Sequence, residues 1–372
     1  ITRLRSVVAH PLRWLSLSYA QSNSEQVAPT VRRNLDGTLA TFGSGTGKEY
    51  GVTVRWGDRL SVRVSRYETT SLGNLSSQRS ARPTPTIGGK GNIIRNDIAN
   101  LENTVRLAGA PLSQRFAYYT DELARQHPDG GNAGATFQEL FELLSDQVAE
   151  GYEATVMGNP TPNWRISVGV ARNESTETNI GTQHFAFIAE RLPIWARYLS
   201  QPVLGTPTIT IGQLLPVAVQ SWNYIRQSEG LVNPLGRKYR VTATTRYGFS
   251  SGRLKGLFAG TTYVWRSPAA VGFRTKTITD NEFATPGVTV GPIEVNDLTQ
   301  PVRGGALTSL DGFIGYSRRL VRSKLTWRVQ LNIRNLLDDR DLLVQRALNT
   351  GIGAIYTAPQ PRTFILTNSF GF

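Results

Sequence analysis

The sequence predicts an all-β fold, namely an antiparallel transmembrane β-barrel with long extracellular loops. Three observations predict it: apolar and polar side chains alternate in many short segments, tight turns alternate with long loops, and the last strand ends in aromatic residues. Among the 372 residues there is no apolar run of about 18 or more, which a membrane-spanning helix would need. A spanning strand needs only about 9–11 residues with every second one apolar, so the mean hydropathy of -0.26 is compatible with a membrane protein.

Alternation is strictest in the segment 325–334. Its odd positions, including Trp327, Val329 and Leu331, are apolar, and its even positions are polar. A period of two places the two sets on opposite faces of a strand, one toward hydrocarbon and one toward a wet interior. Similar or weaker alternation gives 11 candidate strands in all, at 2–9, 12–20, 49–56, 59–64, 152–156, 164–170, 239–244, 257–266, 310–318, 325–334 and 363–372.

The connections between these strands alternate in length. The tight ones hold turn-forming residues at His10-Pro11, Gly57-Asp58, 159–163, 250–252 and 322–324. The intervening ones are long, at roughly 21–47, 72–150, 175–236, 268–307 and 338–359. Short periplasmic turns and long extracellular loops are the arrangement found in outer-membrane barrels. We therefore expect all tight turns at one end of the sheet.

Tryptophans mark the expected turn end. Trp14, Trp56, Trp164 and Trp327 each lie within a few residues of a tight turn. A membrane interface selects such residues because indole is apolar with one polar N–H, so we predict a membrane-interface girdle there. Tyr19, Trp265 and Tyr316 are candidates for the opposite girdle. The alternative is a soluble β-sandwich, which also alternates, although loops of 40 to 80 residues are unusual in one.

Helical spacing of apolar residues occurs inside the long loops. It is clearest in 136–150, where Phe137, Leu140, Phe141, Leu144 and Val148 recur, and weaker in 102–126 and 185–199. We expect helical loop insertions at about 95–150 and 183–200, packed loop against loop. Residues 1–372 would otherwise form part of a single barrel domain.

The charge does not point to nucleic acid. The net charge of +14 comes from 41 basic and 27 acidic residues, and it indicates an anionic partner. The basic residues are scattered, without a run of five or more, and no RNP-like, zinc-finger or helix-turn-helix pattern occurs. A soluble all-β protein that binds polyanions remains an alternative.

The sequence offers little catalytic chemistry. There is no cysteine, and the three histidines, His10, His127 and His184, lie far apart. We expect no metal site, cofactor or catalytic residue, and predict that the protein is not an enzyme. The Gly/Ser-rich segment 43–48 departs from a phosphate-binding loop, because Phe42 replaces the first glycine and Glu49 the Ser or Thr.

Candidate ligand-binding residues fall in two groups. Arginines on the polar faces would line the barrel interior and attract an anionic ligand; they are Arg63, Arg165, Arg240, Arg246 and Arg328, with Arg55 and Arg334 beside them. Each could instead pair with a carboxylate. Aromatic loop residues could line an external binding surface or form loop core; they are Trp195, Tyr198, Trp222 and Tyr224.

The C-terminal strand carries the most specific signal. Phe364, Leu366, Phe370 and Phe372 lie on one face, and the aromatic end resembles the signal that barrel-assembly machinery recognises. The segment 330–338, Gln-Leu-Asn-Ile-Arg-Asn-Leu-Leu-Asp, resembles the "Asn-Leu-Leu/Phe-Asp" box before the last strand of TonB-dependent receptors. Segments 47–51, 151–153, 163–165 and 254–256 are similar to strand starts and turns of the same family. The resemblance covers essentially all strand regions.

The resemblance implies a function and a missing part. It implies a plugged barrel of roughly 22 strands, of which this chain holds about 11, and an outer-membrane receptor that imports a siderophore, vitamin or oligosaccharide. It implies as partners the TonB/ExbB/ExbD energy-coupling complex, acting through a plug region that is not recognisable here, together with membrane lipid and lipopolysaccharide. We interpret the chain as the second half of a longer protein. A passive pore or adhesin-type barrel without energy coupling is the alternative.

Overall fold

The structure is a computed structural model that describes residues 2–25, 33–39, 43–75, 93–131, 143–233, 236–279, 283, 287–288, 292–320 and 325–371. Its main element is one antiparallel sheet of 11 strands. In the order of the sheet these are β1 (Thr2–Leu12), β2 (Leu15–Glu25), β3 (Ser44–Trp56), β4 (Leu60–Leu75), β5 (Leu144–Thr161), β6 (Trp164–Thr178), β9 (Tyr239–Gly248), β10 (Leu257–Arg266), β13 (Leu307–Arg319), β14 (Thr326–Arg334) and β17 (Thr363–Gly371).

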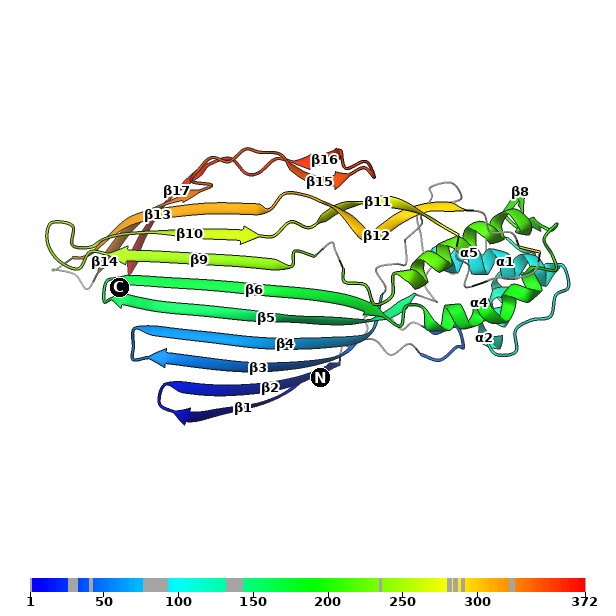
Figure 1. Cartoon of the computed structure of the whole chain (residues 1–372), viewed down its shortest axis with the longest axis horizontal. Coiled ribbons are helices and arrows are strands. Elements are labelled where there is room, and N and C mark those ends of the chain that lie inside the picture. Colours follow the sequence, from blue (N-terminus) through cyan, green and yellow to red (C-terminus); the bar gives the residue numbers. More distant parts are fainter. Residues whose placement is uncertain are drawn as a thin grey trace.

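All 11 candidate strands are confirmed, and each pairs with its neighbour in the order of the chain (Figure 1). The sheet is not closed, because β1 and β17 are each paired on one side only. The tight turns lie together at one end and the long connections at the other (Figure 1). None of the helices in the described residues is long and apolar enough to cross a membrane.

The register places most of the apolar side chains on one face of the sheet and most of the polar ones on the other. Val52 on β3 pairs with Val64 on β4, which pairs with Ala154 on β5. One residue along, Thr53 pairs with Arg63, which pairs with Thr155. Because successive side chains on a strand point to opposite faces, the sheet has one apolar face and one polar face.

The apolar face is not sealed against a second sheet. Val64 is 46% exposed and Leu366 65% exposed. None of the residues in the main buried apolar cluster belongs to the 11 strands; they come from the connections between them. The soluble-sandwich alternative is therefore wrong for the described part of the chain.

The buried core lies in a helical cap beyond the loop end of the sheet (Figure 1). The cap is built from α1 (Ile93–Leu107) and α2 (Ala117–Gln126), which lie between β4 and β5, and from α4 (Thr182–Trp195) and α5 (Ile211–Gln227), which lie between β6 and β9. Three small hairpins complete the loop end: β7 (Pro202–Val203) with β8 (Thr206–Thr210), β11 (Ala270–Ile278) with β12 (Ile293–Arg303), and β15 (Leu343–Ala347) with β16 (Gly353–Thr357).

The structure corrects the predicted helices. Residues 144–150 are not helical, because β5 begins at Leu144, and residues 132–142 lie outside the described residues. The helix α5 was not predicted. Its buried residues include the consecutive run from Ala218 to Ile225, so it shows no clear apolar stripe, and Pro216 lies inside it. A helix buried on most sides lacks the periodicity by which helices are recognised.

The structure also corrects the first turn. His10 and Pro11 lie inside β1, which continues to Leu12 through a register shift, and the turn is at Arg13-Trp14. Pro11 lies between Ala9 and Leu12, where the register of β1 against β2 shifts, and such an irregularity accommodates a residue that has no backbone N–H to donate. The predicted turn at 322–324 lies outside the described residues, as does Phe372.

Candidate functional site

Arginines on the polar face of the sheet gather at its two ends. Five lie close to the tight turns, and we call them the turn-end arginine belt: Arg55, Arg63, Arg165, Arg246 and Arg328. At the opposite end Arg240 pairs directly with Arg266, with Arg237 three residues before Arg240. The five predicted interior arginines are therefore all on the polar face, but they do not form a single site.

Most of the belt is not neutralised. Arg63 donates to Glu49 at 2.7 Å, with side chains 52% and 40% exposed, so this pair contributes little stability. Arg165 and Arg246 pair with one another in register, and neither forms an ion pair with any residue that the structure describes. Arg328 donates to the Gln330 amide oxygen at 2.5 Å. A face with unpaired guanidinium groups attracts anions.

Two phenylalanines lie flat against the polar face beside glycines of the neighbouring strand. Phe258 on β10 pairs with Gly315 on β13, and Phe313 pairs with Gly260. A Cβ atom on Gly315 would lie 2.4 Å from the Phe258 ring, and one on Gly260 would lie 2.4 Å from the Phe313 ring. The missing side chains thus leave the space that the rings fill. Phe258 is 3% exposed although it lies on the polar face.

Replacing Gly315 by alanine is expected to destabilise the sheet by about 1–3 kcal/mol, because the methyl group overlaps the Phe258 ring. Gly312→Ala is the matched control on the same strand, since its nearest neighbour would be 3.5 Å away. Urea unfolding of the refolded barrel, followed by heat-modifiable gel migration, measures both. Equal destabilisation by the two variants would contradict the conclusion that the Phe258 ring fills the space beside Gly315.

Outward side chains change from apolar to charged over three successive rows of the register. The first row is wholly apolar: Leu17, Val52, Val64, Ala154, Val170, Val241 and Trp265. The next row toward the loops consists of tyrosine and arginine: Tyr19, Tyr50, Arg66, Tyr152, Arg172 and Tyr239. The third is polar and charged: Gln21, Lys48, Glu68, Glu150 and Glu174.

This order of rows suits a boundary between hydrocarbon and water. Tyrosine has an apolar ring and a polar tip, and Arg66 stacks over the Tyr152 ring at 5.9 Å while it pairs with Glu150 at 3.6 Å. The register also places the tryptophans Trp56, Trp164 and Trp327 on the apolar face near the tight turns, and Trp14 lies in a turn. Tyr316 is not at the loop end as expected; it pairs with Val329 and contacts Trp327 edge-on, near the turn end.

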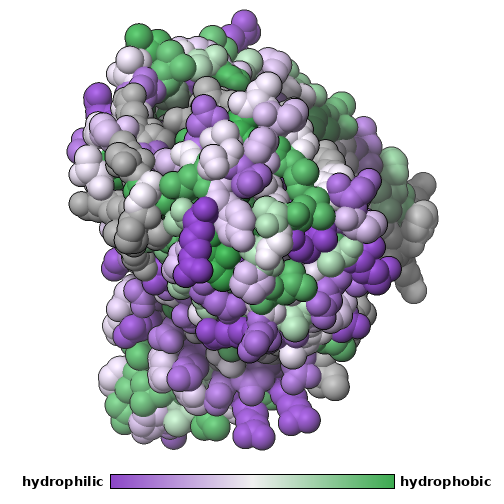
Figure 2. Space-filling model, turned by 90° about the vertical axis from the view of Figure 1, so that its right-hand side faces the viewer, coloured by the Kyte–Doolittle hydropathy of each residue, from purple (hydrophilic) through white to green (hydrophobic). Residues whose placement is uncertain are grey.

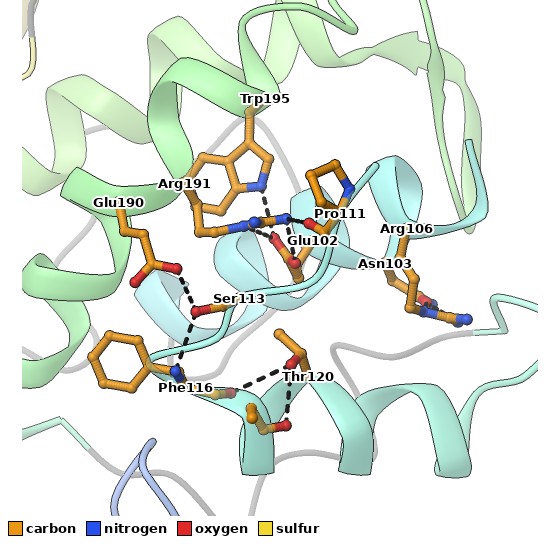
Figure 3. Close-up of polar contacts among 11 residues, drawn as sticks. Glu102, Asn103, Arg106, Pro111, Ser113, Phe116, Thr120, Glu190, Arg191 and Trp195 are labelled. Atoms are coloured by element: carbon orange, nitrogen blue, oxygen red, sulfur yellow. Dashed lines mark hydrogen bonds and ion pairs between the residues drawn. The ribbon is translucent and has the colours of Figure 1, made fainter. Parts of the chain in front are cut away.

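The helical cap is held by a buried polar network (Figure 3). The Glu102 carboxylate on α1 accepts two hydrogen bonds from the Arg191 guanidinium on α4, at 2.9 and 2.7 Å, and one from the Trp195 indole at 3.0 Å. Arg191 also donates to the Pro111 carbonyl at 2.7 Å. Burial raises the pKa of Glu102, and Arg191 opposes that effect. The network joins two loops that are far apart in the sequence.

The predicted aromatic loop residues are core rather than surface. Trp195 and Trp222 are 0% exposed and lie 6.1 Å apart between ring centroids, and Tyr198 packs against the same cluster. Tyr224 is 6% exposed, and burial, assisted by the charge of Asp297, raises the pKa of its hydroxyl to about 12. Trp195, Trp222 and Tyr224 therefore do not line an outer surface, and their interpretation as loop core fits the structure, whereas Tyr198 is partly exposed. Seen end-on, the described surface of the cap mixes hydrophilic and hydrophobic residues (Figure 2).

A cavity of about 390 Å³ lies where the cap meets the sheet. Its lining combines polar and apolar groups and comes from the segment 33–35, Gly73, residues 144–146, Asn179, Gly181 and the first turn of α4. Its polar groups bind one another: Asp146 accepts from Gly73 N at 2.9 Å and from the Asn179 amide at 2.7 Å, and Gln183 accepts from Leu35 N at 3.1 Å. The bond between Asp146 and Asn179 joins β5 to the segment that leads into α4, and the bond between Leu35 and Gln183 joins the segment 33–39 to α4. In the described residues no cluster of three or more His, Cys, Asp or Glu side chains could hold a metal ion.

The sequence analysis missed Phe258, Phe313 and the Glu102–Arg191 pair. The two phenylalanines stand at polar-face positions of alternating segments, and a glycine on the neighbouring strand is the signal that could have found them. No local signal could have found Glu102 and Arg191, which are 89 residues apart.

Comparison with known proteins identifies solved structures that share this fold. No family model and no curated protein sequence matches the chain. Solved structures do match: a chain of the complex of FpvAI with pyocin S2 has a TM-score of 0.51 at 10% identity, over 98% of this chain and 32% of its own length. BauA, the ferric preacinetobactin receptor from Acinetobacter baumannii, has a TM-score of 0.50 at 12% identity, over 99% of this chain and 36% of its own length.

The chain thus spans about a third of the length of the structures it matches, at 32% and 36%. The similarity extends over nearly all of this chain, and it shows that the fold is that of part of an antiparallel β-barrel. The fold class expected from alternation and from the resemblance to TonB-dependent receptors is confirmed.

Proposed function

We propose that the chain is the barrel portion of an outer-membrane receptor that imports a scarce ligand. The observation that carries the proposal is the register of the sheet, which exposes an apolar face across the strands and turns a polar, arginine-rich face the other way. Such an apolar face is stable in hydrocarbon and is an aggregation liability in water. The receptor fold supports the same assignment.

The outward rows support an orientation. The tyrosine and arginine row, followed by the charged row, lies at the loop end, where it would meet lipid headgroups and lipopolysaccharide. The tryptophans at the turn end would form the periplasmic girdle. The loops and the helical cap would then lie outside the cell.

The loop-end arginines are the best candidates for contact with an incoming ligand. Arg237, Arg240 and Arg266 lie together there, and burial and the charge of Arg266 lower the pKa of Arg237. Positive charge at the entrance favours an anionic ligand, such as a ferric chelate. BauA is a receptor for ferric preacinetobactin, which agrees with this class of ligand.

The remaining parts of the function follow from the resemblance to TonB-dependent receptors. Transport would be energised by the TonB/ExbB/ExbD complex through a plug region, and barrel-assembly machinery would insert the sheet. The structures that share its fold include a receptor, which supports a transport receptor and not an enzyme. A passive pore is the competing function.

Uptake of iron-55 chelates by cells that carry the full-length protein tests the proposal. We expect energy-dependent uptake of at least one ferric siderophore, lost on deletion of the gene or of TonB and restored by the intact gene. Uptake that persists without TonB would favour the passive pore.

The loop-end arginines give a finer test. The double substitution R240Q/R266Q is expected to raise the half-saturating ligand concentration roughly fivefold or more, because electrostatic attraction at the entrance is lost. The double substitution R240K/R266K keeps the charge and should leave the value nearly unchanged. An equal effect of both would indicate a structural role.

A further inference from the structure

Two arginines of the turn-end belt contact one aromatic ring on the polar face, and a third lies beside them. The Arg246 guanidinium carbon lies 4.7 Å from the centroid of the Phe258 ring, and that of Arg328 lies 4.8 Å from it. Arg165 is the register partner of Arg246 on the neighbouring strand. We call Arg165, Arg246 and Arg328 the Phe258 arginine cluster. The loop-end ligand contact proposed above uses none of them.

The cluster places like charges close together. Side chains directly opposite on neighbouring strands leave the sheet about 5 Å apart, and like charges in that position destabilise a sheet. Arg165 and Arg246 are in that position, and neither forms an ion pair with any described residue. Asp311 lies one row nearer the loops on the same face, but its carboxylate accepts hydrogen bonds from the Ser309 hydroxyl and from Asn335 N. The cluster therefore has an excess of positive charge that a bound anion would offset.

The stacked guanidinium groups are held so that N–H donors stay available. Phe258 is 3% exposed and fills the space beside Gly315, so its ring has little freedom. Stacking on a ring leaves the edges of a guanidinium group, which carry the N–H donors, open to an oxyanion. Arg328 also donates to the Gln330 amide oxygen, and Gln330 donates in turn to Asn332. The two stacked side chains are thus positioned before an anion binds.

The surroundings of the cluster select a small oxyanion. Its three arginines are exposed. Trp164 and Trp327, which precede Arg165 and Arg328 in the sequence, are on the apolar face, so the arginines point away from lipid. A nucleic acid base would need an open ring for stacking, which the buried Phe258 does not provide. Guanidinium groups bind phosphate and carboxylate oxygens bidentately, and a ligand with two or more charges offsets two arginines at once.

We propose that Arg165 and Arg246 bind a small, multiply charged oxyanion, such as inorganic phosphate or a tricarboxylate, and that Arg328 adds charge beside the Phe258 ring. Arg246 is six residues from Arg240 on β9, about 20 Å along the strand. The cluster is therefore a second anion site, separate from the loop-end contact. The inference does not depend on which ligand the protein imports.

Phenylglyoxal, which modifies accessible arginines, tests the proposal in the full-length protein kept in isolated outer membranes. Peptide mass spectrometry gives the modification rate of each arginine with inorganic phosphate, citrate or sodium chloride added at equal ionic strength. We expect phosphate or citrate to slow the modification of Arg165 and Arg246 about tenfold at ten times its dissociation constant, by mass action. The more protective of the two identifies a tetrahedral or a carboxylate ligand. Arg63, which is already paired with Glu49, is the control and should react at an unchanged rate.

Calorimetric titration of the purified full-length protein with the protecting anion measures the same site through variants. R165Q/R246Q should weaken binding at least about tenfold, since each lost charged hydrogen bond contributes about that factor. F258L keeps the charges but removes the stacking surface, and it should weaken binding roughly two- to fivefold. R63Q should leave the affinity unchanged. Heat-modifiable gel migration shows that each variant is folded.

Three results would overturn the proposal. The first is a cluster that resists phenylglyoxal without any added anion, because another part of the protein then already covers it. The second is equal protection by chloride, which would indicate screening and not a site. The third is an unchanged affinity in folded R165Q/R246Q. Neither measurement involves uptake, so failure of the proposed transport function would leave both results as they are.

Discussion

Replacing Glu102 by alanine is expected to unfold the helical cap or to destabilise it by about 3–5 kcal/mol, while the strands stay paired. The carboxylate is 0% exposed and accepts three hydrogen bonds, two from Arg191 and one from Trp195. Without it, the Arg191 charge stays buried, and the Pro111 carbonyl is the one hydrogen-bond partner left to it among the described residues. An uncompensated charge at such a site costs several kcal/mol, more than the lost attraction alone.

Hydrogen–deuterium exchange of the full-length protein separates the two regions. Peptides from α1 and α4 should lose protection in Glu102→Ala, whereas peptides from β3 and β6 should keep it. Glu122→Ala removes a carboxylate that binds Arg125 at the surface of α2, and it should change protection little. The double substitution E102L/R191M should be less damaging than Glu102→Ala, because it removes both charges. If the double variant were worse, the network would owe its role to the hydrogen bonds of Trp195 and Pro111.

The strands could be predicted from the sequence because alternation directly records the two environments of the sheet. The segment from Trp327 to Ile333 shows this, since every second side chain lies on the apolar face. The strands are longer than predicted where they extend beyond the apolar rows. β4 continues to Leu75 and β5 begins at Leu144, and in these parts both faces carry polar residues. Where both faces are polar, apolar and polar residues do not alternate along the strand, so the sequence does not reveal it.

The cap core and the grouping of the arginines could not be predicted, because both depend on contacts between residues that are far apart in the sequence. The cap core brings Ile94 and Leu101 of one loop against Trp195 and Trp222 of another, and these tryptophans looked equally suitable for a surface. The arginines could be assigned to the polar face by counting alternate positions along each strand. Their division between the turn end and the loop end required the register, and the stacking of Arg246 and Arg328 on one ring required the fold.

The assignment of the two faces can be tested at a single pair of neighbouring residues. Leu331 and Asn332 are adjacent on β14, and the register places Leu331 beside Ile314 and Leu366, and Asn332 beside Phe313 and Ile365. Leu331→Arg puts a charge on the apolar face. We expect it to destabilise the barrel by about 2–4 kcal/mol and to lower its amount in the outer membrane, the cost of arginine near the middle of a bilayer.

Asn332→Arg introduces the same side chain one residue away, and it should be better tolerated because Asn332 lies on the polar face, where it accepts a hydrogen bond from Gln330. Strand propensity, charge and chain position are nearly identical in the two variants, so a difference between them reports only the environment of each face. Folding into vesicles at a series of urea concentrations measures the free energy, and immunoblots of outer-membrane fractions measure the assembled amount. If Asn332→Arg were the more damaging change, the apolar face would be the inside of the molecule. The polar arginine face could then not line a path for a ligand.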